Sequence, residues 1–168
     1  MRTILATPAL QTDSPVRLRI RRAIVRGGLI AGTLDIADAL GFQWAMGRSP
    51  VRVLHYIASG LLGREAAYSG GAAAAALGLL LHYVIAFSAA TAYVVTSLEF
   101  PVLVRRPVVC GMAYGLVVQA VMHFIVLPLA GFRGGLPWGL PLVNLTLAHL
   151  FCVGLPIGLS ARRAMAGK

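Results

Sequence analysis

Charged residues, and acidic residues above all, are scarce in this chain of 168 residues. Only 12% of the residues are charged and five are Asp or Glu, whereas about 25% of the residues of a soluble domain are charged. Hydrophobic residues make up 58% of the chain. A short soluble chain cannot bury so much apolar surface, because small domains keep a large ratio of surface to volume. The composition therefore excludes an ordinary soluble enzyme, a disordered protein and a coiled coil, and it favours an integral membrane protein.

Motifs of soluble catalytic sites are also absent from the sequence. It contains no Gly-rich phosphate loop followed by Lys, no paired-histidine zinc motif and no Ser nucleophile elbow. We therefore expect neither enzyme activity nor a metal site. The two cysteines, Cys110 and Cys152, fall in apolar stretches, where a thiol more often packs as a small apolar side chain than forms a disulfide.

Four long stretches of low charge are the main feature that the sequence does contain. Each is near or above the about 20 residues that a helix needs to cross a hydrocarbon core of about 30 Å. Helices are expected because backbone groups in lipid must satisfy their own hydrogen bonds. The sequence predicts an all-α fold, an integral membrane four-helix bundle between basic tails at 1–26 and 162–168. The predicted spans are 27–45, 72–98, 107–130 and 140–161.

The basic residues lie unevenly about these stretches. With a cytoplasmic N-terminus, 11 basic residues fall inside and 4 outside, the latter being Arg48, Arg52, Arg64 and Arg133. By the positive-inside rule, this bias predicts that both termini are cytoplasmic. It accounts for most of the net charge of +10 without nucleic acid, so the expected partners are the bilayer and its anionic headgroups. An Arg-rich, acid-poor start is also typical of an organellar transit peptide, an alternative that the sequence leaves open.

The predicted outer loops carry apolar and aromatic residues. Residues 51–62 follow Ser49-Pro50 and are apolar but too few to span a bilayer. We expect them to form a short interfacial or re-entrant helix, with His55 at the membrane interface. The second outer loop, 131–139, contains Trp138, a residue type that is enriched at headgroup level.

Polar side chains inside the predicted spans are the candidate functional residues. An ionisable group in the membrane costs about 2.5–3.5 kcal/mol or more, so it is expected to face the bundle interior and find a partner. Asp35 shares a helix face with small residues, and so does His82 in the second span. We therefore predict that these two side chains pair. The full candidate cluster is Asp35, Asp38, His82, Gln119, His123, Asn144 and His149.

Three functions are compatible with this cluster. Its members can simply hydrogen-bond across helices and fix the packing of a structural or accessory membrane protein. They can instead form a conduit for protons or a small solute, because Asp/His relays at mid-membrane are typical of transporters. Four helices make a small transporter, so a homo-oligomer or a membrane-protein partner is then expected. Finally, His82 and His149 can serve as the two axial ligands of a haem.

Several short pieces that follow one another along residues 28–163 resemble, in sequence and in order, the YagU-like family of small bacterial inner-membrane proteins. The resemblance implies a multi-pass protein of the cell inner membrane without established enzyme activity, and it includes His82, His123 and His149 without giving them a role. Asp35 and Asp38 depart from the family pattern, and the first outer loop is shorter here. The matching pieces are Gly28-Leu29-Ile30-Ala31-Gly32, Arg48-Ser49-Pro50, His82 with Glu99-Phe100-Pro101, His123 with Pro128-Leu129, Leu136-Pro137-Trp138, and His149 with Arg162-Arg163.

Overall fold

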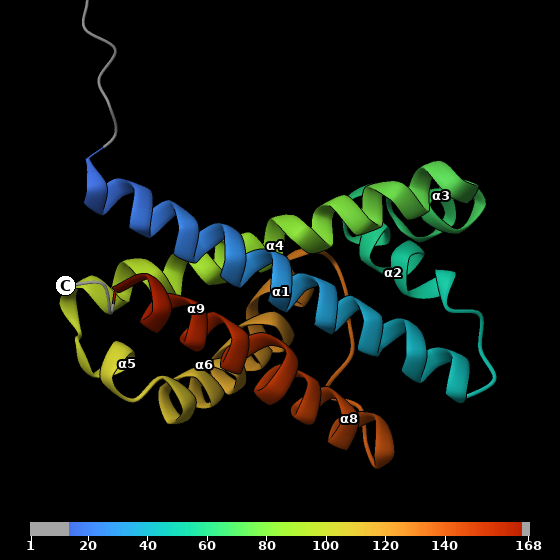
Figure 1. Ribbon diagram of the computed structural model, residues 1–168. Coiled ribbons are helices and arrows are strands. Elements are labelled where there is room, and N and C mark those ends of the chain that lie inside the picture. Colours follow the sequence, from blue (N-terminus) through green and yellow to red (C-terminus); the bar gives the residue numbers. More distant parts are fainter. Residues whose placement is uncertain (1–13, 166–168) are drawn as a thin grey trace, which may run out of the picture.

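The computed structural model describes residues 14–165, and this part of the chain is helical without any strand. The prediction of an all-α fold is confirmed. Four long helical segments cross the molecule (Figure 1), and two of them are composite because π-helical turns interrupt them. The segments are α1 (Pro15–Ala45), α4 (Gly71–Glu99), the series α6 (Pro107–Val121), η1 (Met122–Val126) and α7 (Leu127–Leu129), and the series α8 (Leu140–Ala148), η2 (His149–Gly154) and α9 (Leu155–Met165).

Three shorter helices connect these segments. Helix α2 (Val51–Leu62) lies where the sequence predicts a short apolar helix, and it packs on the first half of α4. Helix α3 (Arg64–Ser69) turns the chain into α4, and α5 (Val102–Arg105) joins α4 to α6. The apolar helix α2 is thus held against the bundle at one end.

Three of the four long segments are long and apolar enough to cross a membrane, which is typical of an integral membrane protein. They are Gly71–Glu99, Pro107–Leu129 and Leu140–Met165. The first predicted span, 27–45, lies within α1, which is long enough at 31 residues. However, α1 contains Asp35 and Asp38 and has a basic first half, so it is less apolar than the other three segments.

Helix α1 begins earlier than the sequence prediction of a tail at 1–26 implies. Ser14 caps it, because its hydroxyl oxygen accepts a hydrogen bond from the Arg17 backbone N–H at 3.4 Å. Pro15 occupies the first helical position, where its missing N–H costs nothing. At the other terminus α9 continues through Arg162 and Arg163. The rest of the predicted tails, 1–13 and 166–168, lies outside the described residues.

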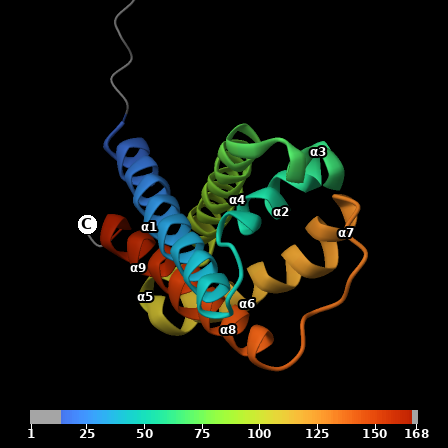
Figure 2. The same ribbon diagram turned by 90° about the vertical axis from the view of Figure 1, so that its right-hand side faces the viewer.

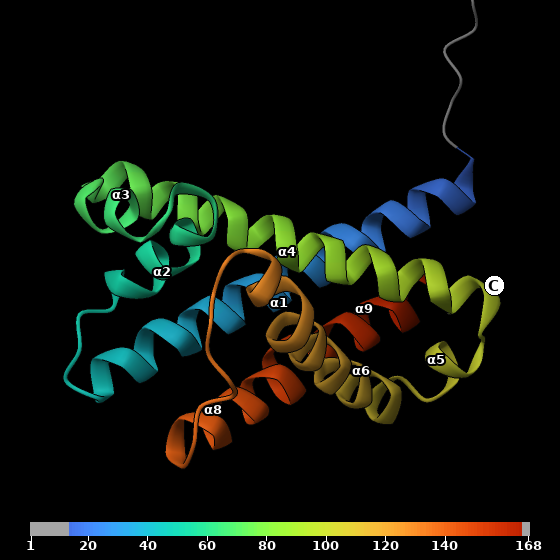
Figure 3. The same cartoon turned by 180° about the vertical axis from the view of Figure 1, so that it is seen from behind.

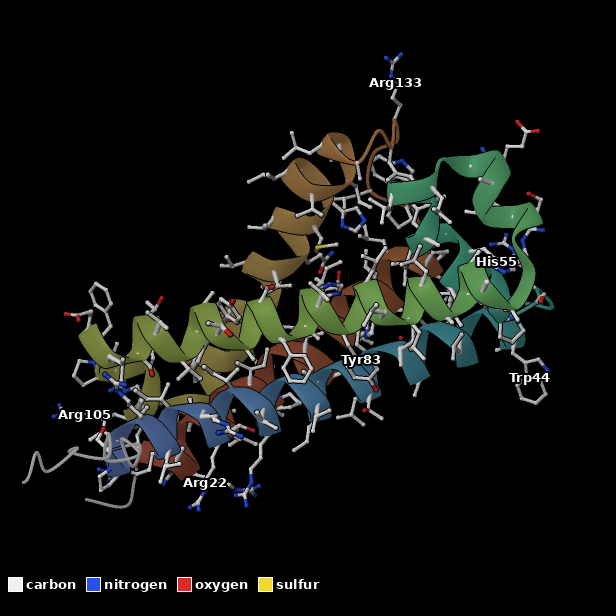
Figure 4. The ribbon with its side chains drawn as sticks, turned by 90° about the horizontal axis from the view of Figure 1, so that it is seen from above. Arg22, Trp44, His55, Tyr83, Arg105 and Arg133 are labelled. Carbon is white, nitrogen blue, oxygen red and sulfur yellow. The ribbon has the colours of Figure 1, made fainter. Side chains whose placement is uncertain are left out.

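The first residue of α1 and the last of α9 lie at the same end of the bundle (Figures 1 and 2). Figure 4 places Arg22 and Arg105 at this end, and Trp44 and Arg133 toward the other. We refer to these as the Arg22 end and the Trp44 end. Helix α1 packs on α4 and α9, while α6 packs on η2 and α9. Helices α1 and α6 therefore lie on opposite faces of the molecule (Figures 1 and 3).

The Arg22 half of the bundle is closed by a dense core. Ala23, Ala90, Tyr93, Ile157 and Ala161 are almost fully buried there and come from α1, α4 and α9. Small side chains let the three backbones approach closely, which is how membrane helices commonly pack. The Tyr93 ring fills the remaining space, and its hydroxyl donates to the carbonyl of Leu103 at 3.0 Å.

Glycines bring α6 into direct backbone contact with the last segment. A Cβ atom at Gly115 would overlap the carbonyl oxygen of His149, and one at Gly154 would overlap the carbonyl of Gly111. In the first segment, Gly28 lies against the ring of Phe87 on α4. Gly115 and Gly154 are required because only a hydrogen atom fits between these two backbones, whereas the atoms that face Gly28 belong to a side chain.

Candidate functional site

Two adjoining hollows occupy the Trp44 half of the bundle. The inner cavity, of about 500 Å³, lies among α1, α2, α4, α6 with η1, and η2, and is lined mainly by apolar side chains. The outer vestibule, of about 1250 Å³, lies between the end of α1, α2, the loop 131–137 and α8. The hollows adjoin each other, and the residues that line both are Asp35, Tyr56, His123, Leu127, Ala130, Phe132, Leu145 and His149.

Four of the predicted site residues line the inner cavity, namely Asp35, His82, His123 and His149. The Asp35 carboxylate interacts electrostatically with His149 and His82, each on a different helix. No hydrogen bond joins Asp35 to His82 among the described residues, although the sequence predicts this pair. The arrangement is thus one carboxylate facing two imidazoles across a shared space.

His82 bonds to the backbone of α1. Its Nε2 donates to the carbonyl oxygen of Gly32 at 2.8 Å, and the acceptor role of the carbonyl fixes the proton on Nε2. Gly32 allows the close approach because a Cβ there would clash with Tyr83 and Ala86. In neutral His82, Nδ1 is therefore the nitrogen that can accept a further proton.

His149 and His123 share a different arrangement, each near the start of a π-helical turn. The Nδ1 of His149 donates to the carbonyl of Leu145 at 2.9 Å, and the Nδ1 of His123 donates to that of Gln119 at 3.2 Å. In both residues Nε2 remains as the nitrogen that can accept a proton.

Prolines explain the two π-helical turns. Pro128 and Pro156 each follow a turn by two residues. Proline lacks the N–H of the helical ladder, and its ring displaces the carbonyl of the residue four positions earlier. The backbone ahead of each proline widens, and such π-bulges occur frequently at functional sites. The sequence did not lead us to expect these turns, although the spacing from histidine to proline is visible in it.

The remaining predicted residues link helices beside the hollows. Asn144 donates through Nδ2 to the Asp38 carboxylate at 2.8 Å, which joins α8 to α1 in the wall of the vestibule. Gln119 lines neither hollow. Its Nε2 donates to the Thr146 hydroxyl at 3.2 Å, while its buried Oε1 has no hydrogen-bond partner among the described residues.

The outer vestibule is rich in arginine, although the sequence alone relates these arginines only to membrane topology. Arg48, Arg52, Arg64 and Arg133 all contribute to its lining. Within residues 14–165 none of these four lies at ion-pair distance from a carboxylate. The Arg52 guanidinium lies over the Tyr68 ring, 5.3 Å from its centroid, whereas the Arg133 side chain points away from the bundle (Figure 4).

His55, which the sequence predicts to lie at the membrane interface, is buried in the protein between α2 and the start of α4. Its Nε2 donates to the carbonyl of Gly71 at 2.9 Å. The bond has the same chemistry as that of His82, yet His55 lines neither hollow. His55 thus provides a matched internal control for His82.

The described residues do not include a group of three or more His, Cys, Asp or Glu side chains that could hold a metal ion. The haem hypothesis requires His82 to ligate iron while Nε2 donates to Gly32, so only Nδ1 would be available without breaking that bond. No family model, curated protein or solved structure matches the chain. The resemblance to the YagU-like family therefore stays a prediction.

Proposed function

We propose that this protein carries protons or a small solute across a membrane, using Asp35, His82 and His149 as its central groups. The observation that supports this most strongly is the position of Asp35, which lines both the outer vestibule and the inner cavity. A carboxylate in contact with a wide hollow that charged residues help to line, and within electrostatic range of two buried histidines, can exchange protons with water and with both rings.

The proposal places α1 in the membrane as a fourth span. Leu29, Ile30 and Leu34 on this helix are exposed, as side chains that face lipid would be. Asp35 and Asp38 are directed instead toward the hollows. Trp44 and Trp138 are 75% and 88% exposed near the Trp44 end, which suits the aromatic belt of a membrane interface.

The distribution of basic residues indicates which end of the bundle lies on which side of the membrane. Basic residues of α1, α5 and α9 gather at the Arg22 end, so this end is proposed to be cytoplasmic in the inner membrane of a bacterium. The vestibule then opens to the outside. A protein of this size is proposed to work as a homo-oligomer or with a membrane-protein partner, and without enzyme activity.

The chemistry of the proton path follows from the hydrogen bonds. His82 keeps its proton on Nε2 and accepts another at Nδ1, whereas His149 keeps Nδ1–H and accepts at Nε2. Each imidazolium then releases one proton to the Asp35 carboxylate or to water. No backbone hydrogen bond breaks in these steps, so the rings can cycle between charge states without moving their helices.

The dense core at the Arg22 end closes the path in this conformation. Tyr93 and Ile157 are almost fully buried beyond the inner cavity, so a proton or solute that enters from the vestibule cannot pass them. Transport requires the Arg22 half to open while the vestibule closes. This conformation is therefore the outward-open one of the two states of alternating access.

The same hydrogen bonds also fix helix packing, and this structural role is the competing explanation. Variants that keep the donor but cannot take up a proton separate the two roles. Glutamine at position 82 places an amide N–H near the position of Nε2, and asparagine at position 149 does so for Nδ1. His82→Gln and His149→Asn therefore preserve the bonds to Gly32 and Leu145 while removing proton transfer.

Proton flux into liposomes that contain the purified protein, under an imposed pH gradient, tests the proposal. The native chain and His55→Gln are expected to give the same flux above that of empty liposomes. Asp35→Asn, His82→Gln and His149→Asn are expected to fall to the empty-liposome rate. Equal flux for the native chain and His82→Gln would reject the relay and favour a packing role.

A further inference from the structure

We infer that the two hollows together bind an amphipathic anion, with a carboxylate or phosphate head in the outer vestibule and one apolar chain in the inner cavity. The inference names the solute class of the proposed function and rests on that proposal for transport. Binding itself can be measured independently of transport.

The charge of the outer vestibule favours an anionic head. Four arginines and two aspartates contribute to its lining. Arg48 and Arg64 have no carboxylate at ion-pair distance within residues 14–165, and Asp38 already accepts a hydrogen bond from Asn144. Guanidinium groups bind carboxylate and phosphate through paired hydrogen bonds. The free donors of the vestibule therefore match an anionic head.

The two aspartates determine where the head can lie. Asp35 is at the junction of the hollows and Asp38 is in the vestibule wall. Both carboxylates repel an anion, whereas Arg48, Arg52 and Arg64 attract it. The head is thus expected at the arginines of α2, α3 and the preceding loop, away from the entrance to the inner cavity.

The inner cavity provides the complementary apolar space. Its volume of about 500 Å³ lies within the range of about 300–1,000 Å³ that is typical of small-molecule sites. The polar side chains of its lining are Asp35, Tyr56, His82, His123 and His149. The apolar lining includes Ile57, Leu61, Leu81, Ile85, Val118 and Val126.

Aromatic rings line the passage between the hollows. Tyr56 and Phe132 contact each other with ring centroids 4.5 Å apart, and both line the vestibule and the cavity. These rings offer an apolar surface to the segment of a ligand that joins its head to its chain. A free inorganic anion would use only the arginines and would leave the cavity unoccupied.

Native mass spectrometry of the full chain in a neutral detergent tests the inference with three probes. They are lysophosphatidylglycerol, lysophosphatidylcholine with the same acyl chain, and inorganic phosphate. We expect lysophosphatidylglycerol to bind about tenfold more tightly than the zwitterionic lipid. Both carry the same phosphate diester, but the arginines of the vestibule repel the choline cation of lysophosphatidylcholine. Inorganic phosphate is expected to compete only weakly because it has no chain.

Two pairs of variants locate the head and the chain. The double variant Arg48→Gln/Arg64→Gln is expected to remove the preference for the anionic lipid, while Arg105→Gln/Arg106→Gln at the Arg22 end keeps it. Val118→Phe fills the inner cavity and is expected to weaken both lipids about tenfold. Val117→Phe, on the 53% exposed neighbour, is expected to leave both lipids bound.

Equal affinity for the two lipids, or equal effects of Val117→Phe and Val118→Phe, would overturn the inference. Tight competition by inorganic phosphate would identify a free-anion site instead and would also overturn it. The proton-flux assay keeps the two proposals apart. Anionic lipid binding without flux rejects only the proposed function, and flux without selective lipid binding rejects only the ligand class.

Discussion

Replacement of Gly115 by alanine is expected to destabilise the contact between α6 and η2. The new Cβ would overlap the carbonyl oxygen of His149 and would lie 2.7 Å from its carbonyl carbon and 3.3 Å from the Cα of Leu150. All three are backbone atoms, so a change of rotamer cannot relieve the overlap. The helices must separate, and the π-helical turn that carries His149 must shift.

The expected magnitude follows from two opposing effects. Overpacking of a close contact costs about 1–3 kcal/mol, and the backbone clash at Gly115 favours the upper value. Alanine also raises intrinsic helix propensity by about 1 kcal/mol relative to glycine. The net loss in the free energy of unfolding is therefore about 2 kcal/mol.

Gly41→Ala is the matched control, because Gly41 lies in α1 and a methyl group added there would meet open space. Only the helix-propensity gain of about 1 kcal/mol applies there. Unfolding in detergent micelles titrated with sodium dodecyl sulfate, followed by circular dichroism, is expected to separate the two variants by about 3 kcal/mol. A Gly115→Ala protein as stable as Gly41→Ala would refute the close packing of α6 on η2.

Two further predictions concern the walls of the vestibule. Asn144→Leu leaves the Asp38 carboxylate without its donor and is expected to cost about 1.5–3 kcal/mol in the same unfolding assay. Adding Asp38→Leu is expected to restore most of that loss, and a further loss would contradict the proposed bond. Burial, and secondarily Tyr68, raises the pKa of the Tyr56 phenol above its ordinary value. The contribution of Tyr56 to the free energy of unfolding should thus stay constant up to about pH 10 and fall as the pH rises further. The ionisation of Tyr56 is measured as the absorbance difference between the native chain and Tyr56→Phe during a pH titration, and ionisation below about pH 10 would contradict this.

The sequence predicts much of the helical framework because apolar length and small-residue spacing act locally. Gly28 and Gly32 meet α4, and Gly111 and Gly115 meet the last segment. The start of α1 was missed because its basic residues obscure any apolar pattern, although Ser14-Pro15 is a recognisable helix start. Helix α1 begins at Pro15, so its charged first half and its apolar second half form one continuous helix.

Some residues of the candidate site could be predicted from the sequence, but their geometry could not. Polar residues within apolar stretches identify Asp35, His82 and His149, since each must face the interior. The hydrogen bonds of the two histidines go to backbone carbonyls and not to one another, and such partners carry no signal in the sequence. The convergence of Arg48 and Arg64 on one hollow likewise depends on how α2 and α3 fold back onto α4.

If the vestibule reaches Asp35 and ends before the Arg22 half, position 35 is accessible from water on the outer side only. Cysteine replaces Asp35 or Ile157 in a background in which Cys110 and Cys152 are alanine. A membrane-impermeant thiol reagent added outside right-side-out vesicles is expected to label Asp35→Cys and to leave Ile157→Cys unlabelled. Protection of both positions, or labelling of Asp35→Cys only from the Arg22 end, would show that the vestibule does not connect Asp35 to the outside.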